Sequence, residues 1–267
     1  KILEILRNKD TYVSGQELSE RFGVSRTAVW KAIHQLEEEG YRIEAVPRKG
    51  YHMVETPDVV CKEEILSLLE TKWAGRNLVY LETVDSTNDL AKKLADQGAP
   101  EGTLVVADEQ TGGKGRRGRA WCTPKGSAIA MTIVLRPDIR PELASMVTLV
   151  MGLSVAKAIG SLYPVSVGIK WPNDVVVNGK KICGILTEMS AEMTGIHYLV
   201  IGTGINTNVE EFPEEIQSVA TSLIKELGEK VNRAELIAAC LKYFENRLQT
   251  PVIFGSMTGR NKCICTF

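Results

Sequence analysis

The chain has 267 residues, of which 44% are hydrophobic and 24% are charged. This length gives room for one large domain or for two to three small ones, and the hydrophobic share is ordinary for a globular protein. The net charge of −1 excludes a global field that would draw the whole molecule to nucleic acid or to a membrane. The six cysteines form no Cys-x-x-Cys pair and no signal peptide is recognisable, so we expect a protein of the reducing cytoplasm without a zinc site or a disulfide framework.

Residues 1–60 are expected to form a small domain of their own. Apolar residues at helical spacing predict three helices, over residues 1–7, 14–22 and 26–39. Two short strand patterns follow on either side of a basic turn, at residues 41–46 and 51–54. Three helices and a β-hairpin in this order resemble a winged helix-turn-helix, whose third helix enters the major groove of DNA.

Six residues of this domain are the candidates for DNA contact: Arg26, Thr27, Trp30 and Lys31 on the third helix, and Arg48 and Lys49 in the turn. Residues 1–55 carry nine basic and nine acidic side chains, so the domain as a whole is neutral. Binding by one copy should therefore be weak, and a dimer that contacts two half-sites is the expected DNA-binding form. The alternative is a winged helix that binds another protein.

A linker helix is expected at residues 61–72, and a larger domain at residues 73–247. A strand pattern at residues 77–84 leads to Ser86, Thr87 and Asn88, which open a helix. Free backbone N–H groups at a helix N-terminus favour an anion or a hydrogen-bond acceptor. Taken alone, these three small polar residues are better explained as helix caps, and a ligand site is the alternative.

A basic, glycine-rich loop at residues 111–119 lies between two buried strand patterns, at residues 103–107 and 127–135. Glycine lets the backbone approach a ligand closely, and arginine offers a planar fork to phosphate or carboxylate. The loop therefore favours an anionic ligand, with a solvated basic turn as the alternative. A dinucleotide fingerprint is a poor alternative, because Trp121 and Pro124 interrupt the helix that it requires.

Polar residues also mark the strands of the C-terminal half. An apolar stretch at residues 143–162 predicts a core helix and not a membrane span, because polar side chains interrupt it. The polar residues Lys170, Asn173 and Asp174 then surround a proline, and buried polar groups need partners or serve a ligand. Asp174 could instead cap the turn.

Two further glycine patterns follow. Asn178-Gly179 lies between strand patterns and predicts a tight hairpin. In the strand at residues 198–208, Gly202 and Gly204 occupy alternate positions, which leaves one strand face bare for a flat ligand. The alternative is a glycine-rich corner of a barrel.

Four motifs thus stand in order along the chain: Asp85-Ser86-Thr87-Asn88, Gly113 to Arg119, Lys170 to Asp174 with Lys181 and Gly184 to Leu186, and Gly202 to Asn206. Together with the N-terminal domain, they closely resemble the family of bifunctional biotin–protein ligases and biotin operon repressors. The resemblance covers residues 1–247. It implies an α+β protein, with a winged helix-turn-helix followed by a mixed-sheet, class II synthetase-like biotin-ligase catalytic domain.

The resemblance implies a reaction in two steps. Biotin and MgATP form biotinyl-5′-adenylate and pyrophosphate, and the adenylate then biotinylates a lysine on the carrier domain of a carboxylase such as acetyl-CoA carboxylase. Without an acceptor, the adenylate-bound chain is expected to form a homodimer that represses biotin synthesis genes at operator DNA. The small molecules implied are biotin, ATP and Mg²⁺, and no metal site built from protein ligands is expected.

The residues that match the family's motifs are implied to carry its roles. Those implied to bind biotin are Ser86, Thr87, Asn88, Gln110, Lys114, Gly115, Arg116, Lys181, Gly184 and Ile185. Those implied to bind ATP or the adenylate are Arg116, Arg119, Trp121, Asn173 and Asn206. Lys181 and Arg116 would stabilise the charge that develops where a carboxylate meets a phosphate, and Asp174 is the candidate to orient or deprotonate the attacking lysine.

Two departures from the family's pattern bear on these expectations. Lys114 stands where the family usually has arginine, so the charge is kept but the bidentate fork is lost. Family members continue into a small C-terminal β-barrel, whereas residues 248–267 show no such pattern. A truncated or frameshifted reading frame is the expected explanation of this atypical tail.

Three alternatives to a working ligase and repressor stay open at this point. One is a biotin-binding repressor with impaired ligase activity, because the barrel is lost. The second is an unrelated winged-helix regulator that senses another acyl-adenylate or carboxylate. The third is a related acyl transferase that acts on lipoate, although the winged helix and the Lys170 to Asp174 motif favour biotin.

Overall fold

The computed structural model describes residues 2–7, 9, 11–192 and 195–248, and the chain divides into two compact units, Lys1–Val59 and Val60–Phe267. The tail predicted at residues 248–267 lies, apart from Leu248, outside the described residues. The first unit ends at Val59, one residue before the end of the small N-terminal domain that is expected from the sequence.

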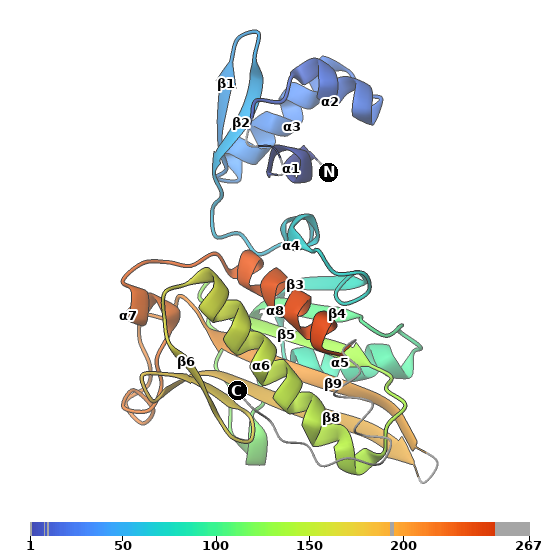
Figure 1. Ribbon diagram of the computed structural model, residues 1–267, viewed down its shortest axis with the longest axis vertical. Helices are drawn as coiled ribbons and strands as arrows, with labels where there is room; N and C mark the ends of the chain where they lie inside the picture. The colour runs from blue at the N-terminus through green and yellow to red at the C-terminus, as the bar shows by residue number, and fades with distance from the viewer. Residues whose placement is uncertain (1, 8, 10, 193–194, 249–267) are drawn as a thin grey trace. The chain divides into compact units, whose positions relative to one another are not determined.

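The first unit has the three helices and the hairpin that the sequence predicts. They are α1 (Ile2–Arg7), α2 (Gly15–Phe22), α3 (Arg26–Glu38), β1 (Arg42–Val46) and β2 (Gly50–Glu55) (Figure 1). Ser25 caps α3, since its hydroxyl accepts a hydrogen bond from Ala28 N–H at 3.1 Å. Val29 and Ile33 of α3 are buried in the core of this unit, which leaves the opposite face of the helix exposed.

The second unit is built on a seven-stranded mixed sheet. Its strands are β3 (Leu78–Val84), β4 (Leu104–Gln110), β5 (Ala128–Leu135), β6 (Val167–Lys170), β7 (Asp174–Val177), β8 (Lys180–Glu192) and β9 (Gly195–Asn206). They lie in the order β3-β4-β5-β9-β8-β7-β6, and among the pairs of these strands only β3–β4 is parallel. β9, the last strand of the sheet in the sequence, thus lies at its centre.

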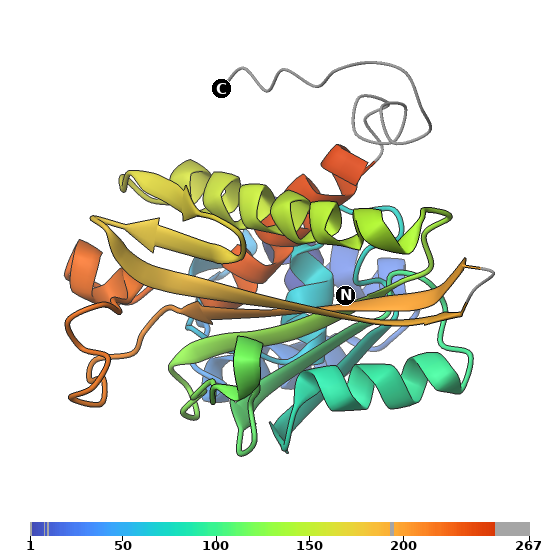
Figure 2. The same cartoon turned by 90° about the horizontal axis from the view of Figure 1, so that it is seen from below.

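Helices cover both faces of this sheet. α6 (Ala144–Leu162) and α8 (Arg233–Leu248) lie on one face, and α5 (Thr87–Asp96) lies on the other (Figure 2). α4 (Lys62–Leu68), which the sequence assigned to a linker, packs against α8 within this unit. The remaining elements are α7 (Leu223–Leu227) and the 3₁₀ turns η1 (Arg116–Gly118) and η2 (Pro141–Leu143).

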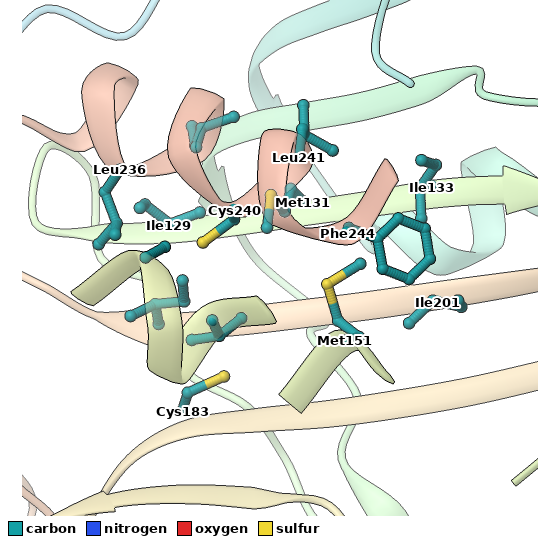
Figure 3. Packing of buried hydrophobic residues seen from close by; sticks show 14 of the residues in the cluster. Ile129, Met131, Ile133, Met151, Cys183, Ile201, Leu236, Cys240, Leu241 and Phe244 are labelled. Carbon is teal, nitrogen blue, oxygen red and sulfur yellow. The ribbon is translucent and has the colours of Figure 1, made fainter. Parts of the chain in front are cut away.

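The main hydrophobic core lies between the sheet and the α6–α8 pair. Figure 3 shows how side chains from β5, β9, α6 and α8 meet there, among them Ile133, Ile201, Met151 and Phe244. α6 is long and apolar enough to cross a membrane, but half of it is buried inside the protein. It therefore behaves as the core helix that the sequence predicts.

The two faces of the sheet carry different side chains, because the side chains of each strand alternate between them. Successive residues of a strand point to opposite faces, so Ile129, Met131 and Ile133 of β5 enter the main core. The residues between them, such as Ala130 and Thr132, face the side that carries α5. α5 covers this second face over only part of its length and leaves the rest without a helix (Figure 2). Residues of the polar motifs line a cavity on this side of the sheet.

A buried carboxylate joins the end of α8 to the segment that leads into β3. Glu245 is only 4% exposed and accepts hydrogen bonds of 2.7–2.9 Å from the backbone N–H groups of Lys72, Trp73 and Ala74. Burial alone would raise the pKa of Glu245, but these three donors, with Ala74 foremost, outweigh burial and lower the pKa below its usual value. The ionised carboxylate is therefore the form that stabilises the fold.

Replacing Glu245 by Gln should lower the free energy of unfolding by about 1–3 kcal/mol at pH 7, because three buried N–H groups lose a charged acceptor. A carboxylate with a lowered folded-state pKa stabilises the fold above its unfolded pKa of about 4.3, and this stabilisation is lost as the pH falls. The difference in the free energy of unfolding between wild type and Glu245→Gln should therefore narrow as the pH is lowered from 7 towards 3. Urea unfolding of the two proteins at several pH values measures this difference.

The matched control is Glu235→Gln, which removes an exposed carboxylate from the same helix. It should change the free energy of unfolding by no more than about 0.5 kcal/mol. A Glu245→Gln variant that is as stable as this control at pH 7 would contradict the anchoring role of Glu245.

Candidate active site

A patch of sheet that is nearly free of side chains lies on the uncovered face. Gly184 of β8, Gly204 of β9 and Ala130 of β5 are register partners across three neighbouring strands. In the adjacent row, Gly202 of β9 lies between Leu186 and Thr132. The predicted bare strand face is thus confirmed, and the barrel corner is wrong, because β9 is a regular strand at the centre of the sheet.

Two side chains lie directly on this glycine floor. A Cβ atom added to Gly204 would come within 2.3 Å of the Trp121 indole, and one added to Gly202 would come within 2.1 Å of Asn88 Oδ1. A Cβ atom on Gly184 would meet the same indole at 2.9 Å and Lys181 Nζ at 3.0 Å. Contacts this close leave no space for a side chain at these positions, which is the physical reason for glycine there.

The N-terminus of α5 brings uncharged polar groups to the edge of the floor. Ser86 caps the helix, because its hydroxyl oxygen accepts a hydrogen bond from Asp89 N–H at 3.4 Å. The hydroxyl and the backbone N–H of Thr87 lie 3.0 and 2.9 Å from Gln110 Oε1, which accepts from both. Ser86 can therefore cap the helix and still donate its hydroxyl hydrogen to a ligand, because the capping bond uses only an oxygen lone pair of Ser86.

The basic loop runs from β4 to β5 alongside this floor. It turns through η1 and contains no α-helix, so the dinucleotide fingerprint is wrong. Lys114 Nζ forms an ion pair with Asp89 Oδ2 at 2.5 Å, and Arg116 Nη1 donates to Asn173 Oδ1 at 2.7 Å. The hydrogen bond from Lys114 holds the pKa of Asp89 below its usual value. Lys114 thus ties the loop to the first turn of α5.

A third cation, Lys181, comes from the β7–β8 hairpin, whose turn has the positive φ angles of Asn178-Gly179 that the sequence predicts. Lys181 Nζ lies 2.7 Å from Asp174 Oδ1 and 5.5 Å from the centre of the Trp121 ring. Asp174 is the register partner of Gly184, so this ion pair borders the glycine floor. A lysine and an aspartate that are 33% and 22% exposed remain accessible to a ligand.

Two cavities meet at these cations. The smaller one, of about 50 Å³, lies over the glycine floor and is lined by the polar residues of the α5 N-terminus. The larger one, of about 440 Å³, is lined mainly by the basic loop and by residues 206–220. Residues common to both linings are Gly115, Arg116, Trp121, Asn173 and Lys181.

Every residue that the sequence assigns to biotin or ATP lines at least one of these cavities. Ile185 lines the smaller one, although its side chain packs into the main core against Gly152 of α6. The individual roles of these residues stay predictions. The sequence missed Thr132 and Glu188, which hold Asn88 in place. The period of two puts Glu188 on the same face of β8 as Gly184, whereas Thr132 meets Gly202 only through the pairing of β5 with β9, which has no local signal.

The six candidate DNA contacts are all exposed on the first unit. Trp30 of α3 is 52% exposed and stacks on His34 with 4.8 Å between the ring centres. Arg48 has a φ of 67° in the turn of the hairpin, and Lys49 Nζ lies 5.6 Å above the Tyr12 ring. The exposed helix face and the basic turn are thus available to a partner.

Known proteins that are similar to this chain include biotin protein ligases. Residues 80–206 match the model of the biotin/lipoate A/B protein ligase family, and residues 1–52 match that of an HTH domain. The chain is 44% identical over 246 residues to the bifunctional ligase/repressor BirA of Bacillus subtilis, a match that covers 91% of this chain and 76% of that protein.

Solved structures agree with the family model. A biotin protein ligase from Aquifex aeolicus in complex with biotin and ATP is 37% identical, with a TM-score of 0.58 over 65% of this chain and 71% of that one. The ligase from Leishmania major in complex with biotinyl-5-AMP is 26% identical, with a TM-score of 0.57 over 72% and 87% of the two chains. The chain therefore belongs to the biotin protein ligase family, with the HTH domain of its bifunctional ligase/repressor members.

Proposed function

We propose that this chain activates biotin with ATP, transfers the biotinyl group to a lysine of a carrier domain, and represses transcription through its winged helix. The observation that carries the proposal is the meeting of the two cavities at Lys181 and Arg116. Uncharged polar groups over a glycine floor suit the ureido ring of biotin, and the cationic larger cavity suits ATP. The biotin carboxylate and the α-phosphate would then meet beside two cations.

In the first step, a carboxylate oxygen of biotin attacks the α-phosphorus of ATP. The bond from that phosphorus to its bridging oxygen breaks, and pyrophosphate leaves. Both reactants are anionic, so Lys181 and Arg116 would cancel their repulsion and stabilise the charge of the transition state. Each cation is already held by a partner, Asp174 and Asn173 respectively, so little reorientation is needed when the substrates arrive.

In the second step, the ε-amine of the carrier lysine attacks the acyl carbon of the adenylate. The bond from that carbon to the phosphate oxygen breaks, AMP leaves, and the amine passes its extra proton to water. Asp174 Oδ1 already lies 2.7 Å from Lys181 Nζ, so we assign Asp174 to orientation of the incoming lysine and of Lys181. Placement of the two reactants would supply much of the rate.

The nucleotide would occupy the larger cavity. Trp121 Nε1 is buried and has no hydrogen-bond partner within the described ranges of the chain, so an oxygen of the adenylate would satisfy it. Asn206, 7% exposed, and Arg119 also line this cavity and would contact the adenine and the phosphates. Mg²⁺ would arrive with ATP, held mainly by phosphate oxygens, because no cluster of three metal-binding side chains occurs among the described residues.

The winged helix would supply the repressor function. Exposed Arg26, Thr27, Trp30 and Lys31 would read base edges, and Arg48 and Lys49 would contact phosphates. Because this unit carries no excess of positive charge, we propose that a homodimer of the adenylate-bound chain binds operator DNA, at two half-sites. Operator DNA and ATP are both found in the cytoplasm, so the cytoplasm is the location that we propose for this chain.

Incubation of the purified chain with biotin, MgATP and a biotin-free carrier domain tests the proposal by intact-mass spectrometry. One added biotinyl group per carrier, absent when lipoate replaces biotin, would support it. Biotinyl-adenylate on the protein without labelling of the carrier would instead identify a biotin-binding repressor without ligase activity. Indifference to biotin would contradict the proposal.

Replacing Gly204 by Ala should slow adenylate formation by roughly 100-fold, because the new methyl group would displace the Trp121 indole from the junction of the two cavities. Pyrophosphate release measures this rate. The matched control is Gly160→Ala in α6, where an added Cβ atom would meet nothing within 4 Å. Equal rates for the two variants would contradict a role of the glycine floor.

Asp174→Ala should lower the rate of transfer at least about tenfold more than the rate of adenylate formation, because Lys181 keeps its charge while the carrier lysine loses its orienting group. Single-turnover measurements with preformed adenylate separate the two steps. An equal loss in both steps would refute this role of Asp174.

Replacing both Arg48 and Lys49 by Ala should reduce the slope of log affinity against log salt concentration for duplex DNA by about 2, because two phosphate contacts are lost. Fluorescence anisotropy at several salt concentrations measures the slope. Lys93→Ala, in the second unit, is the control and should leave it unchanged. An unchanged slope in the double variant would show that the turn does not contact DNA.

A further inference from the structure

The side-chain amide of Asn88 is held from three sides at the floor of the smaller cavity. Its Nδ2 donates to Glu188 Oε2 at 2.8 Å and to the carbonyl oxygen of Leu186 at 3.2 Å. Its Oδ1 accepts a hydrogen bond from the Thr132 hydroxyl at 2.7 Å. Asn88 is 5% exposed, so water competes little with these contacts.

These partners determine which end of the amide is available to a ligand. Both hydrogens of Nδ2 are engaged, whereas Oδ1 has two lone pairs and uses one of them for Thr132. A flipped amide would turn its oxygen towards Glu188 and the carbonyl of Leu186, which are acceptors only and would lose their donor. Asn88 can therefore offer a ligand an acceptor but not a donor.

Glu188 is the charged member of this arrangement, and its charge is balanced. Lys92 Nζ lies 2.9 Å from Glu188 Oε1 and 2.9 Å from Asp89 Oδ1. Burial lowers the pKa of Lys92, but hydrogen bonds to Glu188 and Asp89 outweigh it and raise the pKa above its usual value. Asp89 in turn pairs with Lys114, so the four ionised groups carry no net charge.

Resting on the proposed function, we propose that Glu188 is a positioning residue that sets ligand specificity through Asn88. By holding Nδ2, its carboxylate presents Asn88 Oδ1 as the acceptor for a ureido N–H of biotin. Glu188 reaches Asn88 across 100 positions of the chain because β8 runs beside the α5 N-terminus. The site would thus select for a ligand with a hydrogen-bond donor at this point and against one with an acceptor.

Calorimetric titration of biotin into the purified full chain tests this proposal. Glu188→Gln replaces the carboxylate by an amide that can donate or accept, so the longer contact with the carbonyl of Leu186 is the one acceptor-only contact left to Asn88 Nδ2 among those described, and the preference for one orientation is weakened. The affinity for biotin should fall by about tenfold, the loss of roughly one hydrogen bond. The control is Glu192→Gln on the same strand, whose exposed carboxylate pairs with His197, and it should leave the affinity unchanged.

A selectivity measurement separates positioning from a general loss of structure. Two biotin analogues, each with one ureido N–H replaced by an ether oxygen, are titrated into the same proteins. In the wild type, one analogue should bind about 100-fold more weakly than biotin, because two acceptors would face each other at Asn88. In Glu188→Gln the ratio of the affinity for biotin to the affinity for this analogue should fall to about tenfold or less. A purely structural defect would weaken the binding of biotin and of the analogue alike.

Equal affinity and equal selectivity in wild type and Glu188→Gln would overturn the role of Glu188 and leave the proposed function intact. Failure of the wild type to bind biotin would overturn both. If circular dichroism shows that Glu188→Gln does not fold, Glu188→Asp takes its place, since it keeps a carboxylate for Lys92 but is one methylene shorter. Unchanged selectivity in that variant would equally overturn the proposal.

Discussion

The site depends on a stretch of central β-sheet that carries almost no side chains. Glycine in a strand costs roughly 0.5–1 kcal/mol relative to alanine, yet Gly184, Gly202 and Gly204 occupy adjacent positions of β8 and β9. The space that they leave is used by Trp121 and Asn88, which lie against the backbone itself. The opposite face of the same strands packs into the main core, which stabilises the sheet, while the face with the glycines forms the site.

The charged groups around this floor are arranged in pairs that orient each other. Lys181 is held by Asp174, Lys114 by Asp89 and Arg116 by Asn173. Partly exposed pairs of this kind stabilise a fold by less than about 1 kcal/mol each. Their main effect is therefore on position: Lys181 and Arg116 are held at the junction of the two cavities before an anionic ligand arrives.

Much of this organisation was accessible from the sequence, because local patterns determine it. Apolar periodicity predicted the helices and strands, Asn178-Gly179 predicted its hairpin, and the basic loop at residues 111–119 indicated an anion site. Contacts between distant segments have no local signal. Neither the central position of β9 nor the contact of Glu188 with Asn88 follows from spacing, since both depend on how strands far apart in the chain pair.

The most direct test of the central claim is the exchange of labelled pyrophosphate into ATP, catalysed by the purified chain with and without biotin. If the two cavities bring a carboxylate and an α-phosphate together at Lys181 and Arg116, exchange requires biotin and is abolished in Lys181→Met. Exchange that proceeds without biotin, or no exchange at saturating biotin and MgATP, would contradict the account.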